Sequence, residues 1–169
     1  MGGANPVGME PLRALLSRMG FEDVHSFLQS GNVVFRSDER NGLALEKRLE
    51  ERVAQDLGVR TDIFVRTADG WASLISGNPF VREAAADPGH LLVTVLKDAP
   101  PREAWTRLEA AIQGRERVRG LGRQAYIVYP DGVGRSRLTP AVIEKHLGTR
   151  GSSRNWNTVT KLAALASSL

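Results

Sequence analysis

The sequence lacks cysteine and any long hydrophobic run. Without a thiol, the chain cannot form disulfides, use a cysteine nucleophile or ligate a metal through sulfur. No apolar stretch approaches the roughly 20 residues that a membrane-spanning helix needs. The first eight residues contain neither the basic cluster nor the apolar block of a secretory signal. We therefore expect a cytoplasmic protein with no membrane partner.

Catalytic and cofactor signatures are also lacking. The sequence contains no P-loop, no dinucleotide-binding fingerprint and no zinc-protease motif. Its three histidines, His25, His90 and His146, have no regular ligand spacing. Pairs such as Glu50 and Glu51 are adjacent on a helix, so their carboxylates do not face each other. We assign no catalytic residue, no metal ligand and no cofactor, and leave open whether the protein is an enzyme.

Positive charge is concentrated in the second half. Residues 1–86 carry 10 Lys and Arg against 12 Asp and Glu, a net of −2, whereas residues 87–169 carry 13 against 7, a net of +6. A basic half suits a phosphate-rich partner. The other interpretation is that these residues form an ordinary solvated surface. The excess of Arg, 19 of the 23 basic residues, would then reflect a coding bias of the genome. The run 115–123, with four Arg, allows phosphate contacts or protection of an edge strand.

The apolar pattern repeats along the chain. In the first half we predict helices over 11–19, 42–57 and 69–76 and strands over 24–28, 33–36 and 60–66. A boundary follows at 84–89. In the second half we predict strands over 90–96, 117–119 and 124–129 and helices over 101–113, 140–147 and from 158 onwards. Both halves read as helix, two strands, helix, and the second half has a strand in front.

Four motifs in order carry a family resemblance. They are Gln29 to Phe35, Asn78 to Phe80, Arg135 to Leu138, and Arg154 to Val159. With these motifs the chain resembles the DUF1697 family of bacterial proteins of unknown function, over essentially its whole length. The resemblance implies an α+β fold of two tandem ferredoxin-like modules with short extra helices, which we assign to residues 1–86 and 87–169. It implies no activity.

The chain departs from the family at its start. Members of the family open with an apolar strand and an Arg-Gly-Ile-Asn-Val-Gly-Gly segment, of which only Gly2 and Gly3 match here. The first module therefore lacks its opening strand, and an interior position of its sheet is unfilled. A misplaced start codon, an incomplete module or a strand supplied by a partner chain would each explain the departure.

The strongest candidate site is the start of the last helix. If Asn157 is the N-cap, the free backbone N–H groups beyond it form a positive end that attracts anions. Arg150, Arg154 and Lys161 would add charge, and Trp156 would stack on a ring, with Asn155 beside it. The alternative is structural closure, with Trp156 packed against the helix and both asparagines capping it.

A second candidate is the turn formed by Gln29, Ser30, Gly31 and Asn32. Its side chains can hydrogen-bond a ligand, while Gly31 allows either close approach of a ligand or simply a positive φ angle. A sheet-face RNA reader is not favoured, because such modules carry exposed aromatic residues on their central strands and 90–96 has none.

We therefore predict a binding module for an anionic small molecule, such as a nucleotide or phosphorylated metabolite. The alternative is a structural or homo-oligomer-forming protein, and the third interpretation is an enzyme.

Overall fold

The computed structural model describes residues 7–27 and 31–169 and divides into two compact units. The first unit comprises Met1–Ala72 with Lys161–Leu169, and the second comprises Ser73–Thr160. These units differ from the predicted division at residues 86 and 87. Residues 73–86 belong to the second unit because they pack on its sheet, as shown by the bond from Tyr126 Oη to the carbonyl oxygen of Leu74, 2.6 Å.

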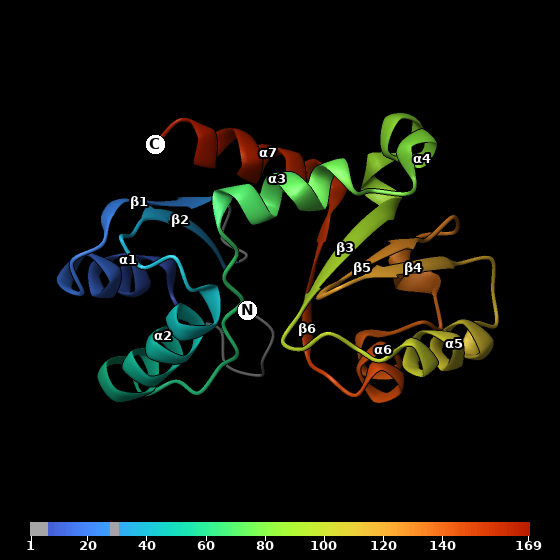
Figure 1. Ribbon diagram of the computed structural model, residues 1–169, viewed down its shortest axis with the longest axis horizontal. Helices are drawn as coiled ribbons and strands as arrows, with labels where there is room; N and C mark the ends of the chain where they lie inside the picture. Colours follow the sequence, from blue (N-terminus) through green and yellow to red (C-terminus); the bar gives the residue numbers. More distant parts are fainter. Residues whose placement is uncertain (1–6, 28–30) are drawn as a thin grey trace. The chain divides into compact units, whose positions relative to one another are not determined.

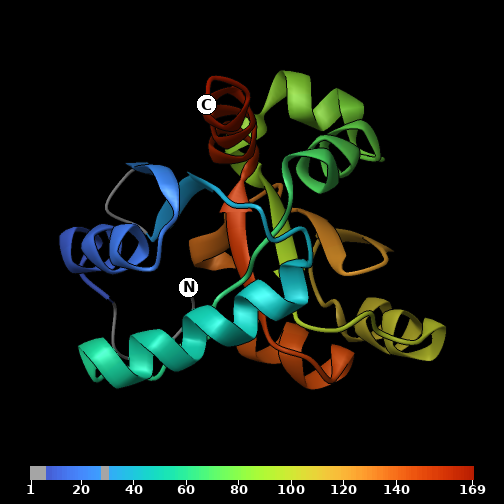
Figure 2. The same cartoon turned by 60° about the vertical axis from the view of Figure 1, so that its left-hand side comes forward.

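The first unit is built on a β-hairpin and two helices. Helix α1 (Met9–Arg18) precedes strands β1 (Glu22–Phe27) and β2 (Asn32–Arg36), and α2 (Gly42–Leu57) follows. The two strands pair antiparallel. Both helices lie on the same side of the hairpin (Figures 1 and 2). The apolar stripes of α1 and α2 meet in a core of Val7, Leu12, Leu15, Leu16, Phe21, Leu45, Leu49 and Val53.

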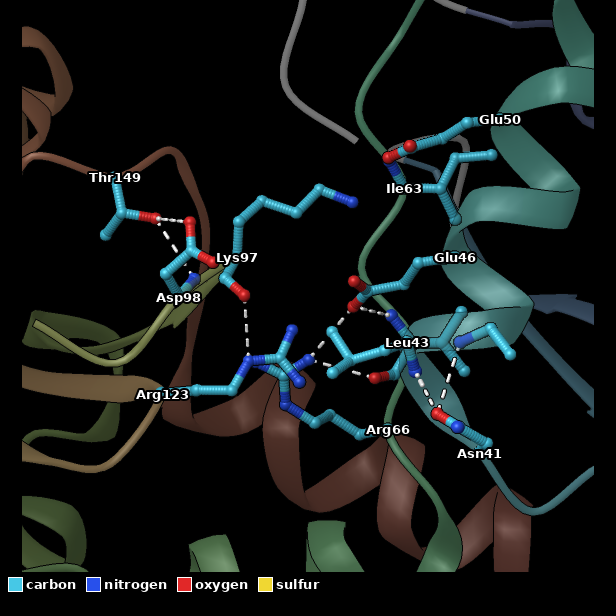
Figure 3. A network of polar contacts seen from close by, with 12 residues as sticks. Asn41, Leu43, Glu46, Glu50, Ile63, Arg66, Lys97, Asp98, Arg123 and Thr149 are labelled. Carbon is cyan, nitrogen blue, oxygen red and sulfur yellow. Dashed lines mark hydrogen bonds and ion pairs between the residues drawn. The ribbon is translucent and has the colours of Figure 1, made fainter.

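No strand is assigned over the predicted strand 60–66, where only Asp62 lies in an isolated β-bridge. Within the described residues the sheet of the first unit contains only β1 and β2. The segment is instead tied to α2, where carboxylates accept its backbone N–H groups. Ile63 donates to Glu50 Oε1 (2.8 Å) and Val65 donates to Glu46 Oε1 (2.9 Å). Arg66 also donates to Glu46 Oε1, at 3.2 Å (Figure 3).

The second unit is a four-stranded antiparallel sheet with helices. After α3 (Ala68–Ser76), which runs into this unit, come α4 (Val81–Ala86), the 3-10 turn η1 (Pro88–His90), β3 (Leu91–Leu96) and α5 (Arg102–Ala111). Then follow β4 (Arg117–Leu121), β5 (Gln124–Val128), the 3-10 turn η2 (Val133–Arg135), α6 (Pro140–Leu147), β6 (Gly151–Asn155) and α7 (Trp156–Ser167). The strand order is β4-β5-β3-β6. The strand β3 is central, as its apolar sequence predicts.

The two faces of this sheet have different covers (Figure 1). On one face, Leu96, Ala125 and Ile127 pack under α5 and α6 in a core completed by Ala104, Leu108, Val118, Tyr129, Leu138, Ile143 and Leu147. On the other face Tyr126 reaches the end of α3. At the sheet edge, Arg117 of β4 pairs with Glu83 of α4 (2.5 Å) and lies over the Phe80 ring.

The Arg-rich run 115–123 lies around the edge strand β4, and its charges are largely used within the second unit. Arg115 pairs with Asp131 and Arg119 with Glu109 (3.3 Å). Arg123 donates to the backbone oxygen of Lys97, 2.9 Å (Figure 3). These partners support protection of the edge over phosphate tracking.

The α+β class is confirmed, with seven α-helices and two antiparallel sheets among the described residues. Two elements were not predicted: α4, which lies partly in the expected boundary, and β6, whose sequence is polar. None of the helices in the described part of the chain has the length and apolar character to cross a membrane.

Candidate functional site

Helix α7 begins at Trp156, directly after β6, so its first turn is fixed by the sheet. Asn155 pairs with Leu92 of β3. Its side-chain Oδ1 accepts the backbone N–H of Thr158 at 3.0 Å. Asn155 is therefore the N-cap, and the assignment of Asn157 as the cap is wrong. Because the helix starts two residues earlier than predicted, Asn157 lies in its first turn with an exposed side chain.

Arg154 lies on the face of the sheet that α3 covers. It stands opposite Val93, and Val93 stands opposite Tyr126, so these three side chains form one row across three strands. The Arg154 guanidinium donates to Ser152 Oγ (2.9 Å) and to the Ser153 carbonyl oxygen (2.8 Å). These two bonds orient the guanidinium. Burial lowers the pKa of Arg154, but a guanidinium remains protonated at neutral pH.

Trp156 lines a shallow depression next to the start of α7. The residue is 9% exposed. The depression has a volume of about 330 Å³ and is lined by residues of three helices and a loop: Ile75, Ser76, Asn78, Val81, Ala84, Ala85 and Trp156. All of these residues belong to the second unit. The structure therefore combines the two interpretations of Trp156: it is largely buried, and part of it still faces an open depression.

The other cations of the predicted site lie away from this helix start. Arg150 precedes β6, and its carbonyl oxygen accepts the N–H of Lys97 at 2.9 Å. It is therefore at the opposite end of the strand from α7, about 13 Å from Arg154 by strand geometry. Lys161 is exposed and lies five residues after Trp156, about 7.5 Å along the helix axis. It is beyond the first turn, where the helix dipole acts most strongly.

The predicted turn site belongs to the first unit. Gln29 and Ser30 lie outside the described residues. Gly31 has a φ of 86°, which explains the glycine by backbone conformation. Asn32 is buried, and its Nδ2 donates to the Phe27 carbonyl oxygen across the hairpin at 3.2 Å. The contacts of Asn32 thus support the structural interpretation of this turn.

Sequence reasoning missed the walls of the depression, which come from α3, α4 and the loop between them. One signal was present: Asn78 belongs to a family motif. In the structure Asn78 is buried and its Oδ1 accepts the Phe80 N–H at 2.9 Å, while its Nδ2 donates to the Phe80 carbonyl oxygen at 3.4 Å. It shapes the loop that leads into α4.

The titratable side chains outside the start of α7 form neither a metal site nor a larger cluster among the described residues. Among residues 7–27 and 31–169, no three His, Asp or Glu side chains gather in a way that could hold a metal. His90 Nδ1 and Asp87 Oδ2 lie 2.6 Å apart on the exposed surface near η1. Burial raises the pKa of Tyr126, and it raises the pKa of Tyr129 to about 12.

Comparison with known proteins gives the class of this fold. The conserved bacterial protein SP0830 from Streptococcus pneumoniae has a similar structure, with a TM-score of 0.72 and 17% identity over 98% of this chain and 92% of that chain. At this identity the likeness shows the fold alone. No curated protein matches.

The family model "Protein of unknown function (DUF1697)" matches residues 1–126. The chain belongs to this family, as its motifs indicated, and the family's function is unknown.

Proposed function

We propose that this protein binds a small molecule with a phosphate or carboxylate group at the start of α7. The depression beside Trp156 carries the proposal, because Trp156 is also the first residue of the helix. A ligand in the depression would lie within reach of the helix's positive end and of Arg154.

The first turn of α7 supplies the anion contacts in this proposal. The first four N–H groups of a helix have no partner within the helix. The Asn155 side chain accepts the backbone N–H of Thr158. Asn157, whose side chain is exposed, contributes another backbone N–H group to this turn. The partial positive charge of these groups stabilises an anion. Arg154, two residues before Trp156 in the chain, adds a guanidinium group, which is charged at neutral pH.

A thermal-shift panel with two matched variants tests the proposal. The panel contains inorganic phosphate, pyrophosphate, nucleotides and sugar phosphates. A ligand at 100 times its Kd stabilises the folded state by about 2.7 kcal/mol, which raises the Tm by several degrees. Arg154→Gln should abolish that shift, whereas Arg150→Gln, at the other end of the same strand, should retain it.

Far-UV circular dichroism of both variants separates loss of binding from loss of folding. A panel without any shift would contradict the proposal. So would an equal loss in both variants, since this result would assign the effect to overall charge.

A second candidate function is self-association through β2. Among the described strands, β2 pairs with β1 on one side only. The β1 strand has an irregular register at Asp23, whose φ is 49° and whose carboxylate pairs with Arg36 at 3.2 Å. Such bulges and charges protect an edge from pairing. Apart from Arg36 at its end, the β2 strand carries Asn32 and the apolar residues Val33, Val34 and Phe35.

Light scattering tests this second candidate. A dimer that Val34→Lys converts to a monomer would support pairing through β2, because a charge on an edge strand opposes strand addition. A monomeric wild-type protein at high concentration would contradict it.

We also infer that the second unit is a ferredoxin-like module. Its order β3-α5-β4-β5-α6-β6, its antiparallel strand order and its two helices on one face support this assignment. Among the described residues of the first unit, α1, β1, β2 and α2 follow the α-β-β-α part of the same order.

A further inference from the structure

We infer that helix α4 is a flap of the second unit, fixed at its start and latched to the sheet by Arg117, and that its opening uncovers Trp156. This inference concerns a movement of the chain and does not depend on the ligand proposed above. The residues that carry it all belong to the second unit.

Burial contributes little to holding α4 in place. None of its six residues is buried, and Val81 at its start is 69% exposed. In Figure 1 the helix lies beyond the end of α3, on the opposite side of the sheet from α5 and α6. Segments with few buried apolar contacts open locally at a small cost in free energy while the rest of the domain stays folded. We therefore expect α4 to open independently of β3, whose residues are mostly buried.

The loop before α4 is the fixed end of the flap. Asn78 and Phe80 are both buried, and the Asn78 side chain bonds both backbone groups of Phe80. At the other end Asp87 is exposed, and a Cβ on Gly89 would meet nothing within 4 Å. A hinge needs only a few residues at the end of an element. Residues 81–86 are therefore the moving part between these two ends.

Arg117 of β4 is the latch. Its guanidinium pairs with Glu83 of α4 at 2.5 Å and lies 5.2 Å from the centroid of the Phe80 ring. The Arg117 side chain is 52% exposed, so the pair is in contact with solvent. Exposed ion pairs and cation–π contacts are each weak. The latch therefore favours the closed position of α4 without locking it.

The flap covers apolar side chains. Val81, Ala84 and Ala85 of α4 line the depression together with Ile75 of α3 and Trp156 of α7. In the closed position Trp156 retains only a small exposed fraction. When α4 moves away, the depression loses one wall, and the other two helices present their apolar side chains to solvent. The flap thus controls access to an apolar surface of the second unit.

Hydrogen exchange followed by NMR tests the inference with two matched variants of β4. Arg117→Gln removes the latch, whereas Arg119→Gln removes an ion pair to α5 from the same strand and leaves the latch. A helix of six residues is unstable without tertiary contacts, so opening exposes its amides to exchange. The amides of Ala84 and Asp87, which are hydrogen-bonded in the closed position, should exchange about threefold faster or more in Arg117→Gln. They should keep the wild-type rate in Arg119→Gln.

A thiol reporter measures access to the depression directly, because the chain contains no cysteine. Ile75→Cys places a thiol in the depression, and Ile112→Cys places one against the core under α5 as a control. When Arg117→Gln is added, a thiol reagent should modify Ile75→Cys about threefold faster or more. The rate for Ile112→Cys should not change.

Faster exchange and labelling with Arg117→Gln alone would support the flap. Equal exchange of the α4 amides in Arg117→Gln and Arg119→Gln would overturn it, since the effect would then belong to the whole edge of the sheet. Wild-type α4 amides that exchange as slowly as those of β3 would also overturn it, because α4 would then open only with the whole unit. If Arg117→Gln fails to fold, Glu83→Gln removes the same ion pair from the helix side and should give the same order with a smaller increase.

Discussion

The two units hold their extended segments in different ways. In the second unit β3 lies between β5 and β6, and both of its edges enter backbone ladders. In the first unit the segment 60–66 is held by two side chains of α2, Glu46 and Glu50, spaced one helical turn apart. The carboxylates accept N–H groups two residues apart, as a neighbouring strand would. Two carboxylates of α2 thus accept backbone N–H groups of this segment, in addition to the isolated β-bridge at Asp62.

Glu46→Gln should produce the largest effect and tests this difference directly. Glu46 is 3% exposed and bonds both the Val65 N–H and Arg66. Loss of its charge leaves Arg66 partly buried without this partner, so we expect the free energy of unfolding of the first unit to fall by about 3 kcal/mol. Hydrogen exchange should accelerate over 60–66 and stay slow in β3.

Glu51→Gln is the matched control on the same helix. Glu51 is exposed and lies 4.0 Å from Lys47, and the free energy should change by less than about 0.5 kcal/mol. Equal protection of 60–66 in both variants would show that the Glu46 carboxylate does not hold this segment.

Gly120→Ala tests how tightly the second unit packs its ladder under a helix. A Cβ on Gly120 of β4 would overlap the Trp105 ring of α5. Overpacking of this kind costs about 1–3 kcal/mol, which urea unfolding will measure. Gly89→Ala, where a Cβ meets nothing within 4 Å, should be close to neutral. Two variants of equal stability would mean that α5 can move away from the sheet.

A pH titration uses the tyrosines as reporters of the second unit, which contains both tyrosines of the chain. Burial raises the pKa of Tyr129 to about 12. The neutral phenol is favoured in the folded state, so its contribution is complete below pH 10 and is lost as the pH rises from 10 to 12. At pH 11 the loss is about 1.4 kcal/mol. Absorbance at pH 10 should show little phenolate; half ionisation there would contradict the burial of both rings.

The smallest effect distinguishes the two asparagines at the start of α7. Asn155→Ala removes the side-chain bond to the Thr158 N–H and should cost about 1 kcal/mol in the free energy of unfolding. Asn157→Ala changes an exposed residue within the first turn and should cost less than about 0.5 kcal/mol. The reverse order in urea unfolding would restore Asn157 as the cap.

The elements with strong local signals were predictable from the sequence. Thr139 and Pro140 begin α6 and Gly148, with a φ of 69°, ends it, as predicted. The apolar run 91–96 forms the central strand. The polar strand β6 gave no such signal, because Gly151–Asn155 has no β-branched or aromatic residue and forms a strand through its ladder with β3.

The candidate site was only partly predictable. Arg154 to Asn157 are contiguous, so their proximity follows from the sequence. Arg150 also appeared close, but the extended conformation of β6 separates it from Arg154. The walls of the depression come from α3, α4 and α7, and no local pattern relates these segments.

The sequence by itself determined the family, the α+β class and the helices whose ends carry proline, glycine or capping residues, because these depend on local chemistry. Only the tertiary structure decided that carboxylates of α2 accept backbone N–H groups of 60–66 and that Asn155 is the cap of α7. It also decided that Trp156 faces a depression lined by α3 and α4. Each of these outcomes depends on contacts between backbone groups and side chains that are far apart in the sequence. Local sequence patterns do not determine such contacts.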